Sequence, residues 1–172
     1  MLSAKKSRLP FEIIEIIIIT FALSWFMKTY LIEFAKIEDR SMLPTLRPNN
    51  VVLVDKFIYS RFDTLDRGDI VVYLSPDKGK TEVKRVIGLP GDTVEIRNGY
   101  TYINGQPLYE PYAEIPVSYL FNPVIVPESE LFVLNDNRDR INDSREFGNL
   151  PLERLEGKAL FSVWPITSIK GL

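Results

Sequence analysis

The sequence predicts a mainly β fold: an antiparallel sheet, or a barrel-like arrangement of strands, over residues 35–172, preceded by one N-terminal helix within residues 1–34. Two observations support this prediction. Residues 13–32 are mostly apolar, as expected of a helix that is hydrophobic on every face. The rest of the chain instead alternates short runs of Val, Ile and Leu with Gly, Pro, Asn and Asp, which is typical of strands joined by turns. No internal repeat is present, so we expect the strands to form one domain.

The apolar N-terminal run is interpreted as a transmembrane anchor. A basic cluster at residues 5–8 precedes it, and the positive-inside rule places that end in the cytoplasm and residues 35–172 on the extracytoplasmic side. The uninterrupted part, residues 16–27, is shorter than the ~20 residues of a span, so Glu15 and Lys28 would lie near the membrane interfaces. Two alternatives stay open: a buried helix of a soluble domain, and a cleaved signal peptide, although no small-x-small site follows the run.

Strands are predicted wherever a short aliphatic run is bounded by turn residues. Asn98-Gly99 favours a type I′ turn and therefore predicts a β-hairpin. Residues 106–128, by contrast, are rich in proline and have little periodicity, so they are predicted to be a loop or an edge excursion. The predicted strands are residues 50–57, 69–75, 82–89, 129–136 and 158–165.

The composition excludes several classes of function. The chain contains no cysteine and no histidine, which rules out a disulfide, a structural zinc site, a cysteine nucleophile and a Ser-His-Asp triad. The net charge of -2 gives no indication of nucleic-acid binding. Hydrolytic chemistry would therefore have to come from Ser, Thr, Lys, Tyr or a carboxylate.

Ser41 is the candidate nucleophile. It lies in DRSMLPTLRPNN, residues 39–50, where two prolines interrupt regular structure, but a serine hydroxyl needs a base to take its proton. In the absence of histidine that base is lysine, provided that burial favours the neutral amine. Lys84 fits best, because it lies inside the aliphatic run EVKRVIGL, whereas the other lysines flank the N-terminal helix, lie on turns or lie at strand or chain ends. The alternatives are an ordinary loop serine and a lysine that points outward from its strand.

Four sequence blocks resemble those of type I signal peptidases. In the order and at the spacing found in that family, they are SMLPTL at 41–46, RGDIVVY at 67–73, VKRVIGLPGD at 83–92 and NDNRDRINDSREFG at 135–148. The resemblance implies a Ser-Lys serine endopeptidase that removes leader peptides from exported preproteins, with Ser41 as nucleophile and Lys84 as general base. It also implies no metal or cofactor, attachment to the lipid bilayer of a cell or thylakoid membrane, and association with the export machinery.

The resemblance implies further roles near the two catalytic positions. Substrates in the family carry small residues at the first and third positions before the cut, a choice that shallow apolar pockets enforce. The positions that match these pockets are Ile37, Met42, Leu46 and Val83, for which plain hydrophobic core is the alternative. The positions that match charge pairs orienting the strand of the base are Arg85, Asp136, Arg138, Asp143 and Arg145, with Arg85 as the partner of Asp136. A surface salt-bridge cluster is the alternative for this group.

Three positions depart from the family pattern. Asn135 replaces a glycine, which raises the question of a positive φ at this residue. Ile141 replaces a serine whose hydroxyl holds the catalytic lysine; isoleucine can only desolvate that lysine, so Asn142 or Ser144 would have to take over the contact. Asp39 replaces a Ser, Thr or Gly that supports the oxyanion hole, where an ionised carboxylate would repel the developing negative charge.

These departures leave a hypothesis from a different class: a membrane-anchored β domain that binds leaders or partner proteins without cutting them. Retention of Ser41 and Lys84 favours the enzyme, because a binding protein needs neither, whereas the changes at positions 39, 135 and 141 favour the binding protein. A third hypothesis, a self-cleaving Ser-Lys peptidase of the repressor type, is disfavoured because the N-terminal segment has no helix-turn-helix pattern.

Overall fold

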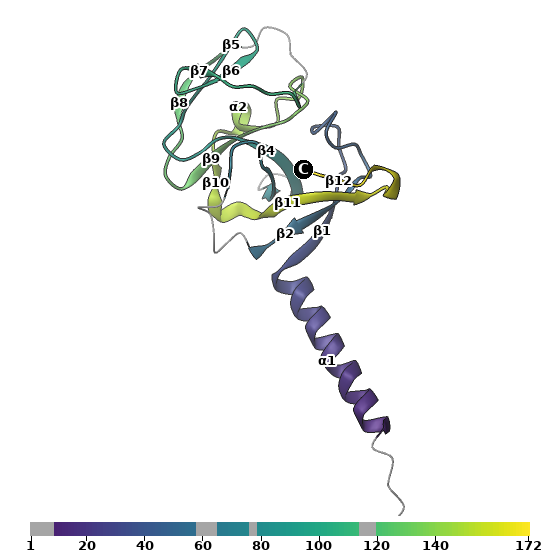
Figure 1. The fold of residues 1–172 in the computed structure, drawn as a ribbon. Coiled ribbons are helices and arrows are strands. Elements are labelled where there is room, and N and C mark those ends of the chain that lie inside the picture. Colours follow the sequence, from purple (N-terminus) through teal and green to yellow (C-terminus); the bar gives the residue numbers. More distant parts are fainter. Residues whose placement is uncertain (1–8, 58–64, 76–78, 114–119) are drawn as a thin grey trace, which may run out of the picture.

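The protein combines one long N-terminal helix with two antiparallel β-sheets (Figure 1). The mainly β fold predicted from the sequence is therefore confirmed. This computed structural model describes residues 9–57, 65–75, 79–113 and 120–172. The basic cluster at residues 5–8, on which the predicted membrane topology rests, lies outside the described residues.

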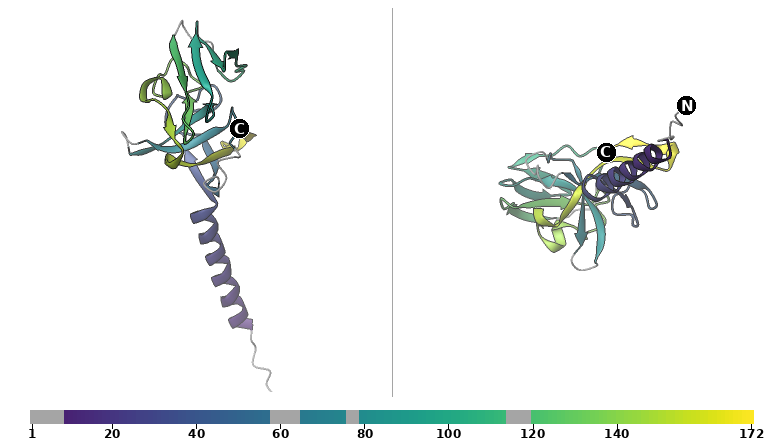
Figure 2. Two further views of the ribbon diagram at one scale, coloured as in Figure 1. Left: turned by 90° about the vertical axis from the view of Figure 1, so that its left-hand side faces the viewer. Right: turned by 90° about the horizontal axis from the view of Figure 1, so that it is seen from below.

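Helix α1, Leu9–Tyr30, exposes apolar side chains on all its faces. Ile13, Ile17 and Phe21, for example, are all largely exposed. The helix runs directly into β1 and points away from both sheets (Figures 1 and 2). Within the described parts of the chain, no helix is both long enough and apolar enough to cross a membrane. The transmembrane anchor predicted from the sequence is therefore not confirmed.

The larger sheet has eight strands in the order β1-β2-β11-β3-β4-β9-β10, with β12 paired to β11. The predicted strands correspond to β2, β3, β4, β9 and β11, so the aliphatic runs identified them correctly to within a few residues at their ends. The bounds are β1 Ile32–Lys36, β2 Val51–Asp55, β3 Ile70–Ser75, β4 Lys80–Gly88, β9 Glu130–Leu134, β10 Leu150–Pro151, β11 Leu155–Trp164 and β12 Lys170–Gly171. Three short helices complete this part of the chain: α2 Ser144–Phe147, and the 3-10 helices η3 Leu152–Arg154 and η4 Ile166–Ser168.

The smaller sheet has four strands in the order β7-β6-β5-β8. The hairpin predicted at Asn98-Gly99 is confirmed: it joins β5 to β6, and both turn residues have positive φ, 50° and 81°. Residues 106–128 contain the two edge strands of this sheet, β7 and β8, and an edge position explains why Pro123 is tolerated inside β8. The bounds are β5 Thr93–Arg97, β6 Tyr100–Ile103, β7 Gln106–Pro107 and β8 Phe121–Ile125.

Gly88 ends β4 at a point where the backbone leaves no space for a side chain. A Cβ atom at this position would lie 2.6 Å from Val94 Cγ2 and 2.9 Å from Phe132 Cβ. The glycine of the VKRVIGLPGD block is therefore required by close packing between β4, β5 and β9. This packing fixes the end of the strand that carries Lys84.

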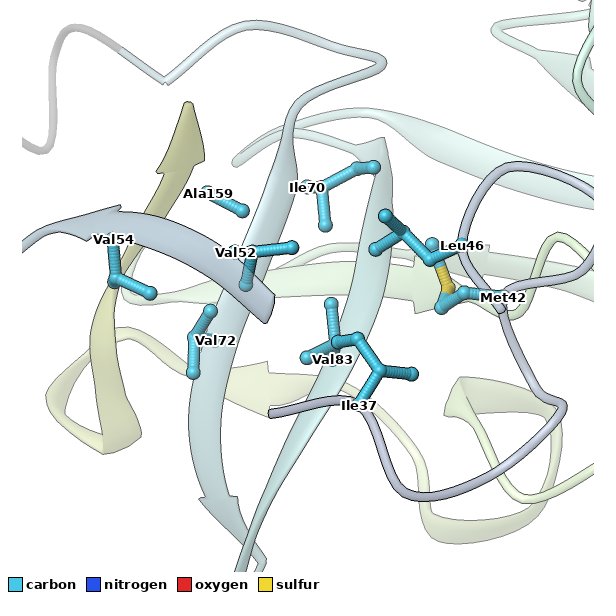
Figure 3. Close-up of a cluster of buried hydrophobic side chains, with 9 residues drawn as sticks. All are labelled: Ile37, Met42, Leu46, Val52, Val54, Ile70, Val72, Val83 and Ala159. Carbon is cyan, nitrogen blue, oxygen red and sulfur yellow. The ribbon is translucent and has the colours of Figure 1, made fainter. Parts of the chain in front are cut away.

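A buried hydrophobic cluster anchors the loop that follows β1 to the larger sheet (Figure 3). Met42 and Leu46 from this loop are fully buried and lie among residues of β2, β3 and β4. Full burial of an aliphatic side chain contributes about 1.5–3 kcal/mol, so the two residues hold Ser41 in a fixed place beside β4. The cluster consists of Ile37, Met42, Leu46, Val52, Val54, Ile70, Val72, Val83 and Ala159.

Candidate active site

Ser41 lies on the loop between β1 and β2, which is tied down from both sides. Its neighbour Met42 is buried in the hydrophobic cluster. From the other side, Asn137 donates its backbone N–H to the Ser41 carbonyl at 2.9 Å and its side-chain Nδ2 to the Arg40 carbonyl at 3.1 Å. The loop is therefore held between the sheet and the segment that follows β9.

The Ser41 side chain is hydrogen-bonded to Asp39. Ser41 Oγ donates to Asp39 Oδ1 at 2.7 Å, and the backbone N–H of Ser41 donates to the same oxygen at 3.1 Å. One carboxylate oxygen thus occupies both groups that a serine peptidase needs free: the nucleophile and a backbone donor for the oxyanion.

Lys84 lies in the middle of β4, and its side chain is only 1% exposed. Its Nζ atom donates to Glu82 Oε2 at 3.1 Å. Because side chains two positions apart on a strand point to the same face, Glu82 and Lys84 are adjacent on one side of the sheet. Burying a polar nitrogen without a hydrogen-bond partner is costly, so the contact with Glu82 offsets the burial of Lys84.

Glu82 is itself held in place from two other parts of the chain. The Tyr73 hydroxyl on β3 donates to Glu82 Oε2 at 2.9 Å, and Asn142 Nδ2 donates to the same oxygen at 3.3 Å. Burial raises the pKa of the Tyr73 phenol well above its ordinary value, and the neighbouring Glu82 charge raises it further. Tyr73 therefore remains a hydrogen-bond donor throughout the pH range in which the protein is expected to work.

Ser41 and Lys84 line the same cavity, which has a volume of about 190 Å³. Within the described residues no hydrogen bond joins them: Ser41 is held by Asp39 and Lys84 by Glu82. The arrangement brings a hydroxyl and a buried amine to one small concave site. Each of the two groups also has a carboxylate as its hydrogen-bond partner.

The four positions matched to substrate pockets divide into two groups. Ile37 and Val83 line the cavity beside Ser41 and Lys84. Met42 and Leu46 are completely buried in the hydrophobic cluster and do not line this cavity. Ile37 and Val83 belong to the same hydrophobic cluster as Met42 and Leu46, so the match of all four positions to substrate pockets stays a prediction.

Arg85 and Asp136 form the ion pair predicted from the sequence. Arg85 Nε and Nη2 donate to the two carboxylate oxygens of Asp136 at 2.7 and 2.6 Å. Arg85 also donates to the Gly68 carbonyl at 2.6 Å, and its guanidinium lies 3.9 Å from the centre of the Tyr112 ring. This buried pair joins β4 to the segment after β9.

The other three charged residues form pairs away from Lys84. Arg145 Nε and Nη2 donate to the carboxylate of Asp143 at 2.8 and 2.7 Å, and Asp143 accepts the backbone N–H of Asn135 at 3.0 Å. Arg138 pairs with Glu110, a partner that the sequence did not predict. Their contacts organise the segment from Asn135 to Phe147, whereas the Arg85–Asp136 pair includes a residue of the strand that carries Lys84.

Two of the three departures from the family pattern have simple structural consequences. Asn135 is fully buried and has no positive φ; among described non-glycine residues a positive φ occurs at Asn49, Asn98 and Asn104. Ile141 is 49% exposed, so about half of its side chain faces solvent.

The contact that a serine at position 141 was expected to supply comes instead from a residue that the sequence reasoning missed. Glu82 holds Lys84 directly, and Asn142 reaches Glu82 rather than the lysine. Ser144 takes no part, because its Oγ accepts the backbone N–H of Val133. Glu82 was open to prediction, since it lies two residues before Lys84 on a predicted strand.

Comparisons with known proteins bear on the family of this chain. A family model described as signal peptidase, peptidase S26, matches residues 11–164. Signal peptidase I of Leptolyngbya laminosa is 38% identical over 151 residues, which cover 83% of this chain and 74% of the relative. Signal peptidase I of Bacillus licheniformis is 35% identical over 179 residues, which cover 98% of this chain and 96% of the relative. Thylakoidal processing peptidase 1 from Arabidopsis thaliana is 31% identical and covers 83% of this chain and 45% of the relative. The resemblance inferred from the four sequence blocks is thereby confirmed.

Proposed function

Since this chain belongs to the signal peptidase family, peptidase S26, we propose that it is a serine endopeptidase that removes N-terminal leader peptides from exported preproteins. Ser41 is the nucleophile and Lys84 the general base. The observation that carries this proposal is the shared cavity of about 190 Å³, which Ser41 and the buried Lys84 both line. The cavity thus brings the proposed nucleophile and base to one small concave site, as Ser-Lys chemistry requires.

The reaction proceeds in two steps. The neutral amine of Lys84 takes the proton of Ser41 Oγ as this oxygen attacks the carbonyl carbon of the peptide bond, and the resulting ammonium gives the proton to the departing amine. The leader remains bound to Ser41 as an acyl-enzyme. Water then attacks this ester with Lys84 again as base, which releases the leader and restores the serine.

The oxyanion of each step forms beside the backbone N–H of Ser41. In the resting protein this N–H donates to Asp39 Oδ1 at 3.1 Å. The carbonyl oxygen of a bound leader therefore takes the place of the carboxylate oxygen, and Ser41 Oγ turns from Asp39 to Lys84. Asp39 must move away, or lose its charge by protonation, for the oxyanion to form.

Two neighbouring cavities suggest how a leader would lie. The cavity beside Ser41 and a second one of about 290 Å³ share Lys36, Glu38, Lys80 and Thr81. They lie between β1 and the first half of β4, and β9 pairs with β4 only from Arg85 onward. An extended peptide can hydrogen-bond to such strand edges. The small cavity, walled by Ile37 and Val83, would then accept only small side chains before the cut.

Attachment to a lipid bilayer through α1 is part of the same proposal, with the N-terminus on the cytoplasmic side and residues 35–172 on the extracytoplasmic side of a cell or thylakoid membrane. The apolar surface of α1, exposed on every face, supports it, because exposed apolar surface of this extent marks contact with a partner or membrane. Replacing Ile16, Ile17, Ile18 and Ile19 by serine should release the protein from membranes during alkaline carbonate extraction. Extraction of the unmodified chain under the same conditions would contradict the attachment.

Cleavage of a preprotein with an Ala-x-Ala site tests the enzymatic proposal. The unmodified chain, in lipid or detergent, should cut after the second alanine, while Ser41→Ala and Lys84→Ala should not. Ser168→Ala and Lys170→Ala, which change an exposed serine and an exposed lysine away from the cavity, are the matched controls and should cut normally.

Binding without cleavage is the second candidate function. The hydrogen bonds from Ser41 to Asp39 and from Lys84 to Glu82 favour it, because they occupy both members of the dyad. In this case the unmodified chain binds the leader with the same affinity as Ser41→Ala and releases no product.

A further inference from the structure

We propose that Glu82 is a positioning residue for Lys84 and forms, with Ser41 and Lys84, a Ser-Lys-Glu arrangement in which the carboxylate stabilises the ammonium produced when Lys84 takes the serine proton. This inference rests on the proposed peptidase function and adds a residue to its machinery. Its basis is the 3.1 Å contact between Glu82 Oε2 and Lys84 Nζ at the buried end of the catalytic cavity.

The position of Glu82 is fixed from three elements of the fold. Its own strand, β4, aligns it with Lys84 on one face. The Tyr73 hydroxyl on β3 donates to it at 2.9 Å, and Asn142 from the segment before α2 donates to it at 3.3 Å. A surface ion pair has no such supports, and its partners move freely in solvent. Here the carboxylate is 11% exposed and the amine 1% exposed.

The chemical role follows from the course of the proton. Before attack the proton is on Ser41 Oγ; during attack it is on Lys84, whose amine becomes an ammonium ion; afterwards it is on the departing amine. A fixed carboxylate beside Nζ favours the middle stage, in the same way that the aspartate of a Ser-His-Asp triad orients and stabilises the protonated histidine. Because Ile141 has no hydrogen-bonding group, Glu82 takes over the orienting contact that the family assigns to a serine.

Steady-state kinetics of three variants on the Ala-x-Ala preprotein test this inference. Glu82→Ala removes the contact, and Glu82→Gln keeps its size and an acceptor but removes the charge. Glu95→Gln is the matched control, because Glu95 also pairs with a basic residue two positions away on one strand, Arg97 at 3.1 Å, but lies on the smaller sheet. Thermal unfolding of each variant and the rate of Ser41 acylation by a fluorophosphonate probe are measured in parallel.

The expected result is a loss in kcat of about 100- to 1000-fold for Glu82→Ala and of about 10-fold for Glu82→Gln, the range of positioned acid–base groups. KM should change by less than about twofold, since the effect lies in the chemical step. Acylation of Ser41 by the probe should slow in parallel, and Glu95→Gln should behave as the unmodified chain.

Two results would overturn the inference while leaving the proposed function intact. In the first, the unmodified chain cuts, Ser41→Ala does not, and both Glu82 variants keep kcat within about threefold. In the second, Glu82→Ala lowers the unfolding temperature and raises KM, and Glu82→Gln restores both with full kcat, which identifies a structural hydrogen bond that does not need the charge. If the unmodified chain does not cut, or if Ser41→Ala still cuts, the proposed function fails and the inference fails with it.

Discussion

Lys84 and Arg85 are consecutive residues of β4, and both are buried beside a carboxylate, yet their surroundings differ. Arg85 makes two hydrogen bonds to Asp136, a third to the Gly68 carbonyl, and lies against the Tyr112 ring. Lys84 makes one carboxylate contact, to Glu82, and borders a cavity. Since neighbouring residues of a strand point to opposite faces, one strand presents a fixed cation on one side and an amine that borders a cavity on the other.

The difference follows from the chemistry of the two side chains. A guanidinium remains charged in proteins, and its planar fork matches both oxygens of a carboxylate, which suits a permanent link between strands. An amine that is held by one carboxylate and borders a cavity can exchange its proton. The comparison therefore assigns structure to the Arg85–Asp136 pair and chemistry to the Lys84–Glu82 pair, and the two assignments can be tested separately.

Lys84→Met should have the largest effect on activity. Methionine keeps the length of the side chain and removes the amine, so cleavage should fall by ~10⁴-fold or more, as when a member of a catalytic triad is removed. Folding should be retained, because the Glu82 carboxylate keeps the Tyr73 hydroxyl and the Asn142 amide as hydrogen-bond donors. Initial rates of preprotein cleavage and a thermal melt check both points; an inactive variant that is also unfolded would show that Lys84 holds the fold together.

Asp136→Ala should have the largest effect on stability. Removal of one partner of a buried pair leaves the Arg85 charge uncompensated and should lower the free energy of unfolding by about 3–5 kcal/mol. Urea denaturation measures this loss, and Glu95→Ala, which breaks an exposed pair of the smaller sheet, should cost less than about 1 kcal/mol. Equal losses in the two variants would mean that the buried pair has no special structural role.

Asp39→Ser should raise activity by about tenfold. The Asp39 carboxylate accepts both the hydroxyl and the backbone N–H of Ser41, and an oxyanion-hole donor is worth about 100-fold or more in rate, so freeing that N–H recovers part of this factor. Asp39→Asn keeps the size of the side chain and removes its charge, so it separates the effect of the charge from the effect of the size. Progress curves of preprotein cleavage at one pH give the ratio, and a fall in kcat/KM for the serine variant would show that Asp39 assists the reaction.

Tyr73→Phe should have the smallest effect of these changes, and the pH-dependent part of its effect on stability should appear at alkaline pH. Burial raises the pKa of Tyr73, so the folded protein holds the phenol proton more tightly than the unfolded chain, in which tyrosine titrates near pH 10. The resulting stability is fully present below about pH 10 and is lost as the pH rises further. Above about pH 10 the free energy of unfolding of the unmodified chain should fall by up to ~1.4 kcal/mol per pH unit more than that of Tyr73→Phe. Urea denaturation at several pH values measures this difference. Parallel pH profiles would contradict the raised pKa.

Local patterns were sufficient for the strands. Aliphatic runs between turn residues identified five strands of the larger sheet, and Asn98-Gly99 identified a hairpin, because both signals depend on neighbouring residues alone. The absence of histidine, together with a lysine inside an aliphatic run, made Ser41 and Lys84 candidates, and the family resemblance gave them their proposed roles. Their juxtaposition in one cavity required the fold.

Other features depend on packing that the sequence does not state. An apolar residue has the same appearance whether it lines a pocket or fills a core, so the full burial of Met42 and Leu46 could not be predicted from the sequence. Arg138 pairs with Glu110, which lies far away in the sequence beyond a proline-rich stretch. No pattern of neighbouring residues predicts this pair. Glu82 did have a local signal, because it lies two residues before Lys84 on a predicted strand. That spacing matters only if both side chains are buried, which the sequence does not state.

Cleavage of a preprotein with an Ala-x-Ala site, read by mass spectrometry of the released leader, tests the central claim most directly. The unmodified chain should release a leader that ends at the second alanine, and Ser41→Ala and Lys84→Ala should release none. An intact preprotein that remains bound to the unmodified chain would contradict the claim and identify a protein that binds leaders without cutting them.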